Sequence, residues 1–192
     1  IRSVLPDAII FTEGGLWRTP HENSGTLVEN TVNAAHWYDG LPLYTKKYFS
    51  SFTIDFMNDR FVFGRRNVQV SISRQLFEIK QQTETVSLRP TLIGEFGIPF
   101  DMCGRKAYRT GDYSKQLAAL DACYQGIEAS LLSSTLWNYT YDNDHTMGDL
   151  WNNEDFSIYS ATGKSGSDDL NEGGRAILAF VRPYVRYTAG TL

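Results

Sequence analysis

The chain has 192 residues, a formal net charge of −4 and an apolar content of 42%. These values describe a globular chain rather than a disordered one, and they give no reason to expect a nucleic-acid partner, because phosphate binding needs a basic surface. No apolar run approaches the roughly 18 residues that a membrane-spanning helix needs.

Four apolar runs are typical of β-strands. In chain order they cover residues 7–12, 31–38, 91–96 and 134–139. Short, continuous apolar runs of this kind favour buried parallel strands over half-exposed antiparallel ones. Two stretches rich in Gly, Asn, Asp and Ser, at residues 14–30 and 141–169, follow strand ends and are expected to be long loops.

Three helical patterns alternate with these strands, at residues 67–85, 113–133 and 171–181. In the first two, apolar side chains recur at steps of three or four residues, which is the spacing of one helix face. Asp112 is expected to cap the second helix, and Pro183 to stop the third. The alternation of strands and helices predicts an α/β fold with a parallel sheet.

Side chains with chemical uses stand at the ends of all four apolar runs. They are Glu13, His36, Tyr38, Glu95, Trp137 and Tyr139. The carboxyl ends of parallel strands are where (β/α) barrels and doubly wound sheets bind their ligands, so this pattern marks a candidate active site. No Gly-x-Gly-x-x-Gly phosphate loop follows any of the runs, which disfavours a dinucleotide cofactor.

Glu95 is the main catalytic candidate, because a carboxylate inside an apolar strand must be paired or used. Gly94 and Gly97 allow another backbone or a ligand to approach it closely. His36 and Tyr38 are two residues apart and therefore share one face of a strand. Structural roles stay open, namely a rim ion pair for Glu95, a packed hydrogen-bonded pair for His36 and Tyr38, and aromatic packing at the end of the last run.

A glutamate, a His-x-Tyr pair and a tryptophan at consecutive strand ends suit glycoside hydrolysis. The retaining reaction needs a nucleophilic carboxylate and an acid/base carboxylate roughly 5–5.5 Å apart. Imidazole and phenol groups can hydrogen-bond sugar hydroxyls and orient the nucleophile, while an aromatic ring supports the sugar. These residue types are therefore compatible with the hydrolysis of O-glycosyl bonds.

The order of these motifs resembles the C-terminal half of a clan A (β/α)8 TIM barrel from glycoside hydrolase family 5. The resemblance places His36 and Tyr38 at the end of strand six, where they contact substrate or nucleophile. It places Glu95, in its Glu-Phe-Gly setting, at the end of strand seven as the nucleophile, and Trp137 at the end of strand eight beneath the sugar.

Residues 148–157 and the ending at 182–191 resemble one branch of that family more narrowly. This is the endoglycoceramidase-like branch, with the fungal steryl-β-glucosidases and glucocerebrosidase-type enzymes. The resemblance implies a retaining β-glucosidase for steryl glucosides or glucosylceramide-like glycolipids, presented at a membrane surface. It implies no cofactor and no metal.

The resemblance also implies that part of the barrel is absent from this chain. Strands one to four are expected to precede Ile1, and residues 1–192 to form one unit, the half-barrel of strands five to eight, without a second domain. The other half would bring the acid/base glutamate, because the Asn-Glu pairs at 153–154 and 171–172 follow the last strand. Glu13 is the internal alternative for this role, and the isolated chain is otherwise expected to be inactive.

Three other functions stay open. A barrel fragment that only binds a glycan or glycolipid would use His36, Tyr38 and Trp137 but would not need Glu95. A metal-dependent hydrolase is disfavoured, because the three histidines are scattered along the chain. A structural α/β domain without a site leaves the four strand ends unexplained. The two cysteines are expected to be free thiols, and the expected location is the cytoplasm or the vacuole.

Overall fold

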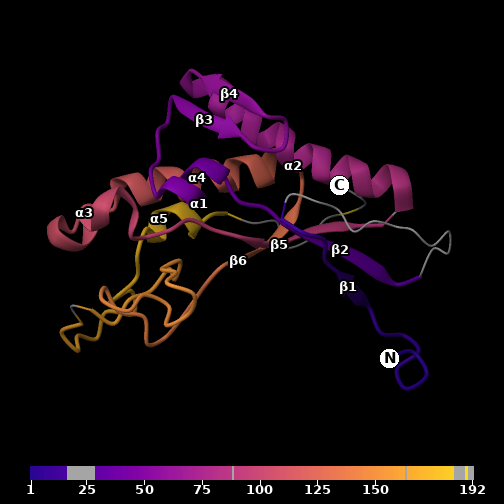
Figure 1. The fold of residues 1–192 in the computed structure, drawn as a ribbon. Coiled ribbons are helices and arrows are strands. Elements are labelled where there is room, and N and C mark those ends of the chain that lie inside the picture. Colours follow the sequence, from indigo (N-terminus) through magenta and orange to yellow (C-terminus); the bar gives the residue numbers. More distant parts are fainter. Residues whose placement is uncertain (17–28, 88, 163, 184–188, 190–192) are drawn as a thin grey trace.

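The computed structural model describes residues 1–16, 29–87, 89–162, 164–183 and 189, and it shows a sheet beneath a layer of helices (Figure 1). The strands are β1 (Ile10–Thr12), β2 (Thr31–His36), β3 (Phe52–Asp55), β4 (Arg60–Phe63), β5 (Thr91–Phe96) and β6 (Ser133–Leu136). The helices are α1 (Gly40–Thr45), α2 (Arg65–Ser87), α3 (Met102–Thr110), α4 (Ser114–Ala129) and α5 (Ile177–Phe180).

Four of the strands form one parallel sheet, in the order β1-β2-β5-β6. The predicted α/β fold with a parallel sheet is therefore confirmed. The pairing sets His36 beside Glu95, and Phe96 beside Leu136. The carboxyl ends of β2, β5 and β6 consequently lie at one end of the sheet, toward the left in Figure 1.

Helices α2 and α4 cover one face of this sheet. The predicted apolar face of α2 is confirmed, since each of its four side chains is at most 2% exposed: Val68, Ile72, Leu76 and Ile79. They pack in one core with Ala35 of β2 and Ile93 of β5. On β2 the burial alternates along the strand, and Val32, Ala34 and His36 are half-buried rather than buried.

Several predicted boundaries were wrong. Helix α4 ends at Ala129, and Leu131 beyond it is 65% exposed. Asp112 is not the N-cap of α4, because Tyr113 holds that position, although Asp112 Oδ1 accepts a hydrogen bond from the Ser114 amide at 3.0 Å. The last helix, predicted over residues 171–181, is only the four residues of α5. The first strand, predicted over residues 7–12, is only the three residues of β1. β1 is not a buried strand, since Phe11 lies at the sheet edge and is 58% exposed.

The sequence patterns missed α1, α3 and the antiparallel β3–β4 hairpin. Helix α1 is a short turn that follows β2 directly, and the Asp39 side chain caps it by accepting from the Leu41 amide at 3.3 Å. Helix α3 is kinked, with positive φ angles at Cys103, Gly104 and Arg105. Elements of this length carry too few residues for a periodic signal.

The segment between β6 and α5 is irregular, as its composition predicted. Buried Arg175 anchors it: its Nη2 lies 2.7 Å from Asp155 Oδ1, and its guanidinium lies over the Phe100 ring. Asn143 Nδ2 donates to Asp149 Oδ1 at 2.7 Å and to Asp155 Oδ1 at 3.0 Å. These buried polar contacts replace the secondary structure that would otherwise fix the segment.

Both cysteines are free thiols, Cys103 at the surface and Cys123 in the core. None of the helices in the described part of the chain is long and apolar enough to cross a membrane.

Candidate active site

Three of the predicted site residues meet at the carboxyl ends of β2 and β5. The Tyr38 hydroxyl donates to Glu95 Oε1 at 2.5 Å, and His36 Nδ1 lies 3.5 Å from Glu95 Oε2. The parallel register that sets His36 beside Glu95 makes both contacts possible. Each oxygen of the carboxylate therefore has its own partner, which fixes the plane of the Glu95 carboxylate.

Tyr38 is a buried hydrogen-bond donor, with 6% of the residue exposed. Burial, followed by its hydrogen bond to Glu95, raises the phenol pKa well above its ordinary value. The charges of Glu95 and Glu154 act in the same direction. The edge of Phe156 also packs on the Tyr38 ring, with centroids 5.7 Å apart. The phenol thus keeps its proton at any physiological pH and donates a hydrogen bond to the carboxylate.

His36 lies between two carboxylates. Its Nε2 is 3.4 Å from Glu13 Oε2, on the side opposite Glu95. The Glu13 side chain is 57% exposed, whereas His36 and Glu95 are 25% and 23% exposed. Glu95 therefore lies in a half-buried position that solvent can reach, with the imidazole separating it from Glu13.

Trp137 lies next to the site at the end of β6, and a backbone hydrogen bond to β5 holds it there. Its amide donates to the Phe96 carbonyl at 2.8 Å, and its side chain is half-buried. The Trp137–Asn138 peptide bond is cis. Strand β6 ends at Leu136, so the predicted extent of this strand, residues 134–139, was wrong, and Trp137 and Tyr139 lie beyond its end. Tyr139 is 66% exposed, and its ring lies 5.5 Å from that of Tyr159.

The glycines around Glu95 allow the close backbone approaches that the sequence indicated. A Cβ on Gly94 would lie 2.9 Å from the Ala34 carbonyl oxygen of β2. A Cβ on Gly97 would lie 2.2 Å from the Trp137 carbonyl oxygen. The two glycines therefore let β5 fit between its neighbours at the point where Glu95 is presented.

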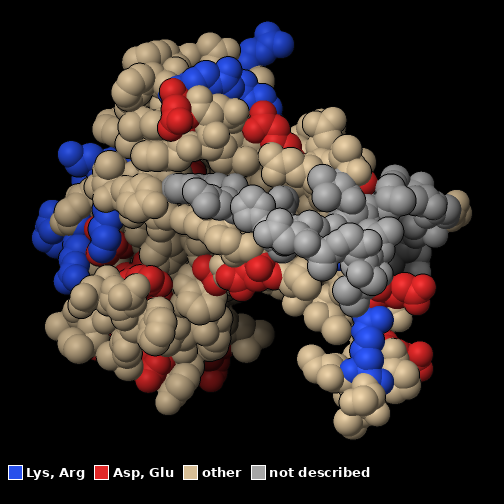
Figure 2. Space-filling model, turned by 45° about the vertical axis from the view of Figure 1, so that its right-hand side comes forward, with Lys and Arg blue, Asp and Glu red and all other residues tan. Residues whose placement is uncertain are grey.

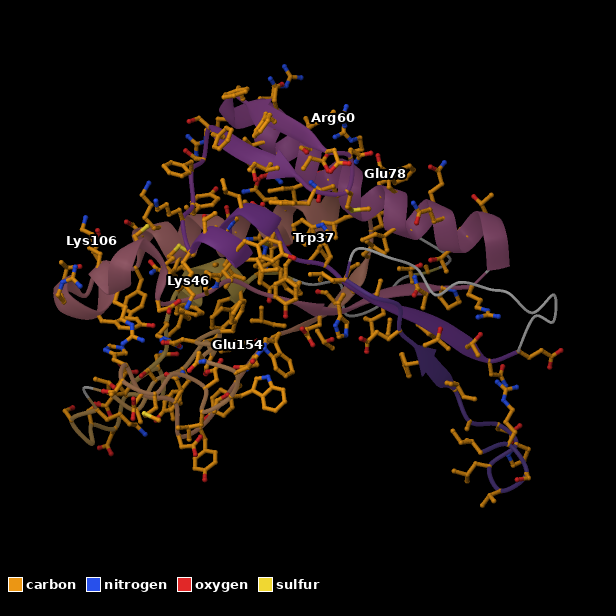
Figure 3. The ribbon with its side chains drawn as sticks, viewed as in Figure 1. Trp37, Lys46, Arg60, Glu78, Lys106 and Glu154 are labelled. Atoms are coloured by element: carbon orange, nitrogen blue, oxygen red, sulfur yellow. The ribbon has the colours of Figure 1, made fainter. Side chains whose placement is uncertain are left out.

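Sequence reasoning missed how residues 148–157 complete this site. Asp149 Oδ2 accepts from the Phe156 amide at 2.7 Å, and so holds the ring that packs on Tyr38. Glu154 from the same stretch contributes its charge to the environment of Tyr38 (Figure 3). The family resemblance had singled out residues 148–157, but it did not predict that they lie beside Tyr38.

The site offers carboxylates, an imidazole and a phenol. Among the described residues, no group of three His, Cys, Asp or Glu side chains is arranged to hold a metal ion. The arrangement can present an oriented carboxylate to an electrophilic carbon, which is the requirement for a covalent glycosyl intermediate.

Comparison with known proteins gives consistent results, although no family model matches the chain. It is 37% identical to a protein named glucosylceramidase from Aspergillus fumigatus, over 94% of this chain and 25% of that protein. It is 42% identical to ergosteryl-beta-glucosidase from Saccharomyces cerevisiae, over 74% of this chain and 20% of that protein. The chain thus spans about a quarter of the length of these relatives.

Solved structures agree. The crystal structure of sterylglucosidase 1 from Cryptococcus neoformans with a compound named hit 1 superposes with a TM-score of 0.85 at 31% identity. The superposition covers 95% of this chain and 29% of that one. A second structure of the same protein, with tris, gives a TM-score of 0.84. The sequence and fold of this chain are therefore similar to part of larger proteins named glucosylceramidase, ergosteryl-beta-glucosidase and sterylglucosidase 1.

Proposed function

Because this chain belongs to the family of the fungal glucosylceramidases and ergosteryl-β-glucosidase, we propose that it supplies the nucleophile half of a retaining β-glucosidase. The observation that supports this most directly is the Glu95 carboxylate, held by Tyr38 and His36 at the ends of two adjacent parallel strands. The substrate class is a glycolipid, a steryl glucoside or a glucosylceramide-like molecule, as the names of the relatives suggest.

The proposed fold of the whole protein is a (β/α)8 barrel in which β1, β2, β5 and β6 are strands five to eight. Two observations support it. The helices cover one face of the sheet, while alternate residues of β2 on the other face stay half-exposed. The sheet also has two outer edges, on β1 and β6, that no other described strand pairs with. A second half of four strands would pair both edges and close the barrel.

The proposed reaction has two steps. In the first, a Glu95 oxygen attacks the anomeric carbon while an acid protonates the leaving glycosidic oxygen, which releases the aglycone as a free alcohol and leaves an α-linked glycosyl-enzyme. In the second, the same acid group, now a base, takes a proton from water, and the water oxygen displaces Glu95. Tyr38 and His36 orient the nucleophile, and Trp137 supports the sugar ring.

The acid/base group is proposed to come from the half of the barrel outside this chain. Glu13 does not fill the role well, because it is more than half exposed and lies on the far side of the His36 imidazole from Glu95. Glu154 lies near Tyr38, but there its charge acts by raising the pKa of the Tyr38 phenol, not by contact with Glu95.

Covalent trapping tests the proposal. The natural full-length protein is incubated with an activated 2-deoxy-2-fluoro-β-glucoside, and its peptides are analysed by mass spectrometry. A glucosyl adduct on the peptide that carries Glu95 is expected, as is a loss of at least about 10³-fold in aryl β-glucoside hydrolysis for Glu95→Gln. Glu13→Gln is the matched control and should keep most of the activity and the adduct.

Other outcomes would overturn parts of the proposal. An adduct on a different carboxylate would overturn the assignment of Glu95. Hydrolysis by the isolated 192-residue chain would overturn the half-barrel and point to Glu13 as the acid. Retained glycolipid binding without hydrolysis in the full-length protein would favour the non-catalytic binding function.

A further inference from the structure

The β3–β4 hairpin has its polar and apolar positions exchanged. Thr53 and Asp55 of β3 face the protein and are 1% and 0% exposed. Phe61 and Phe63 of β4 are 68% and 66% exposed. A two-stranded ribbon that packs on a helix usually buries its apolar side chains and exposes its polar ones. The reversed order indicates that the outer face of this hairpin meets an apolar phase.

The aromatic side chains on this outer face, three of them exposed and that of Phe52 half-buried, form one contiguous group, which we call the hairpin patch. It consists of Phe49, Phe52, Phe61 and Phe63. Phe52 lies at its centre, with ring centroids 5.1 Å from Phe63, 6.4 Å from Phe61 and 6.4 Å from Phe49. Contiguous apolar surface of this kind marks an interaction site, whereas single exposed apolar residues do not.

The border of the hairpin patch is basic, although the chain as a whole carries a net charge of −4. Within residues 47–66, four exposed side chains are basic and one is acidic: Lys47, Arg60, Arg65, Arg66 and Asp59. Buried Asp55 forms ion pairs with two arginines: its Oδ2 lies 3.5 Å from Arg60 Nη2 and 2.5 Å from Arg74 Nη2. Figure 2 shows basic side chains at the top of the molecule, where Figure 1 places the hairpin.

The hairpin is fixed to the end of β2 that carries the candidate site. Asp39, which follows Tyr38 directly, accepts a hydrogen bond at Oδ1 from the Thr53 hydroxyl of β3 at 2.9 Å. Figure 3 shows Arg60 at the hairpin, above the buried Trp37. The patch and the site therefore share one end of the molecule.

We propose that the hairpin patch docks the protein on the surface of an anionic phospholipid bilayer. Aromatic rings that enter the interface beside arginines that reach lipid phosphates are the combination that holds peripheral proteins on such a surface. The choice of a bilayer over another anionic partner rests on the proposed function, because a glycolipid presents its sugar at a bilayer surface. Docking would bring the strand ends with Glu95 close to that sugar.

Vesicle flotation tests this on the natural full-length protein. Vesicles of phosphatidylcholine alone are compared with vesicles that also contain phosphatidylserine. Phe61→Ser with Phe63→Ser is expected to lower partitioning to the anionic vesicles at least tenfold, and Arg65→Gln with Arg66→Gln by roughly tenfold, with the arginine effect disappearing in high salt. Hydrolysis of a water-soluble aryl β-glucoside should be unchanged in both variants.

Two controls separate the patch from general effects. Gln81→Glu with Gln82→Glu changes the net charge by the same amount as the arginine pair, at exposed positions on the other half of α2, and should leave partitioning unchanged. Leu178→Ser removes a 78% exposed apolar side chain from α5 and should also have no effect.

Two results would overturn the proposal. Unchanged partitioning in the phenylalanine variant would show that another segment covers the patch. An equal loss of partitioning in the Gln81→Glu, Gln82→Glu control would show that the arginine effect comes from net charge and not from the position of the arginines. Flotation uses no glycoside, so it gives its result even if the proposed hydrolysis fails.

Discussion

At the scale of single side chains, the phenol of Tyr38 controls one oxygen of Glu95. Tyr38→Phe removes this donor and keeps the packing against Phe156. We expect kcat for an aryl β-glucoside to fall roughly tenfold to a hundredfold, the effect of losing one hydrogen bond to a charged group, with little change in KM. Steady-state kinetics of the full-length protein measure both parameters.

Tyr44→Phe provides the matched control, because Tyr44 is 62% exposed and packs on Phe56 rather than on the site. It should leave kcat and KM unchanged. A Tyr38→Phe variant whose kcat stays within twofold of the parent would contradict the orienting role of the phenol.

The carboxyl group of Asp39 makes stability depend on pH. Burial raises its pKa to about 6, although hydrogen bonds from Thr53 and Leu41 act in the opposite direction. The folded state therefore holds the Asp39 proton more tightly than the unfolded state does. This contribution to stability is complete below about pH 4 and is lost as the pH rises through 6.

Asp39→Asn should remove that dependence. Relative to the parent, the free energy of unfolding of Asp39→Asn should rise by about 2–3 kcal/mol between pH 4 and pH 7, since each pKa unit corresponds to about 1.4 kcal/mol. Urea unfolding across this range measures the difference. Exposed Asp7→Asn serves as the control. Parallel curves for Asp39→Asn and the parent would contradict the assignment.

At the scale of elements, the join between β5 and β6 depends on the absence of a side chain at Gly97. A Cβ there would lie 2.2 Å from the Trp137 carbonyl oxygen, which is backbone and cannot move without shifting the end of β6. We expect Gly97→Ala to lower the free energy of unfolding by about 1–3 kcal/mol and to reduce activity, because Trp137 moves. Thermal unfolding and aryl glucoside kinetics measure the two effects.

Gly15→Ala is the corresponding control, since a Cβ there meets nothing within 4 Å and the backbone does not need a positive φ. Its melting temperature should match that of the parent. If Gly97→Ala were as stable as Gly15→Ala, the backbone at the end of β6 would have to shift at little cost in free energy. Trp137 would then be held less tightly than the structure indicates.

The elements that the sequence predicted well are those whose burial follows one period over many residues. The apolar face of α2 that contains Ile72 and Leu76 repeats over about three turns, so its helical spacing stood out. Glu95 stood out as a charge inside an apolar run, and the register then brought His36 to it. Strand ends are reliable places to look for a site, because the parallel sheet gathers them at one end.

The elements that the sequence did not predict are those whose burial follows tertiary contacts instead. In the β3–β4 hairpin, Asp55 is buried because Arg60 and Arg74 pair with it, and Phe61 is exposed, so the usual alternation is reversed. Residues 148–157 are placed by carboxylate contacts with backbone amides that leave no periodic trace. No local pattern could have set Phe156 against Tyr38.

At the scale of the whole molecule, the open sheet edges should govern how the isolated chain behaves. Among the described strands, β1 and β6 each have one unpaired edge, and Ile9 and Phe11 beside the β1 edge are 62% and 58% exposed. Unpaired edges and exposed apolar side chains promote association between copies of a chain. We therefore expect the isolated 192-residue chain to form oligomers in light scattering after gel filtration.

Adding the proposed N-terminal half should convert these oligomers into a one-to-one complex that hydrolyses aryl β-glucosides, because both edges then have their natural partners. Phe11→Lys separates the two effects: a charge at the β1 edge should reduce self-association of the isolated chain and also weaken assembly with the other half. A monomeric isolated chain that Phe11→Lys does not change would contradict the open-sheet interpretation. It would require the sheet to close on itself, and the proposed barrel would then lose its main structural support.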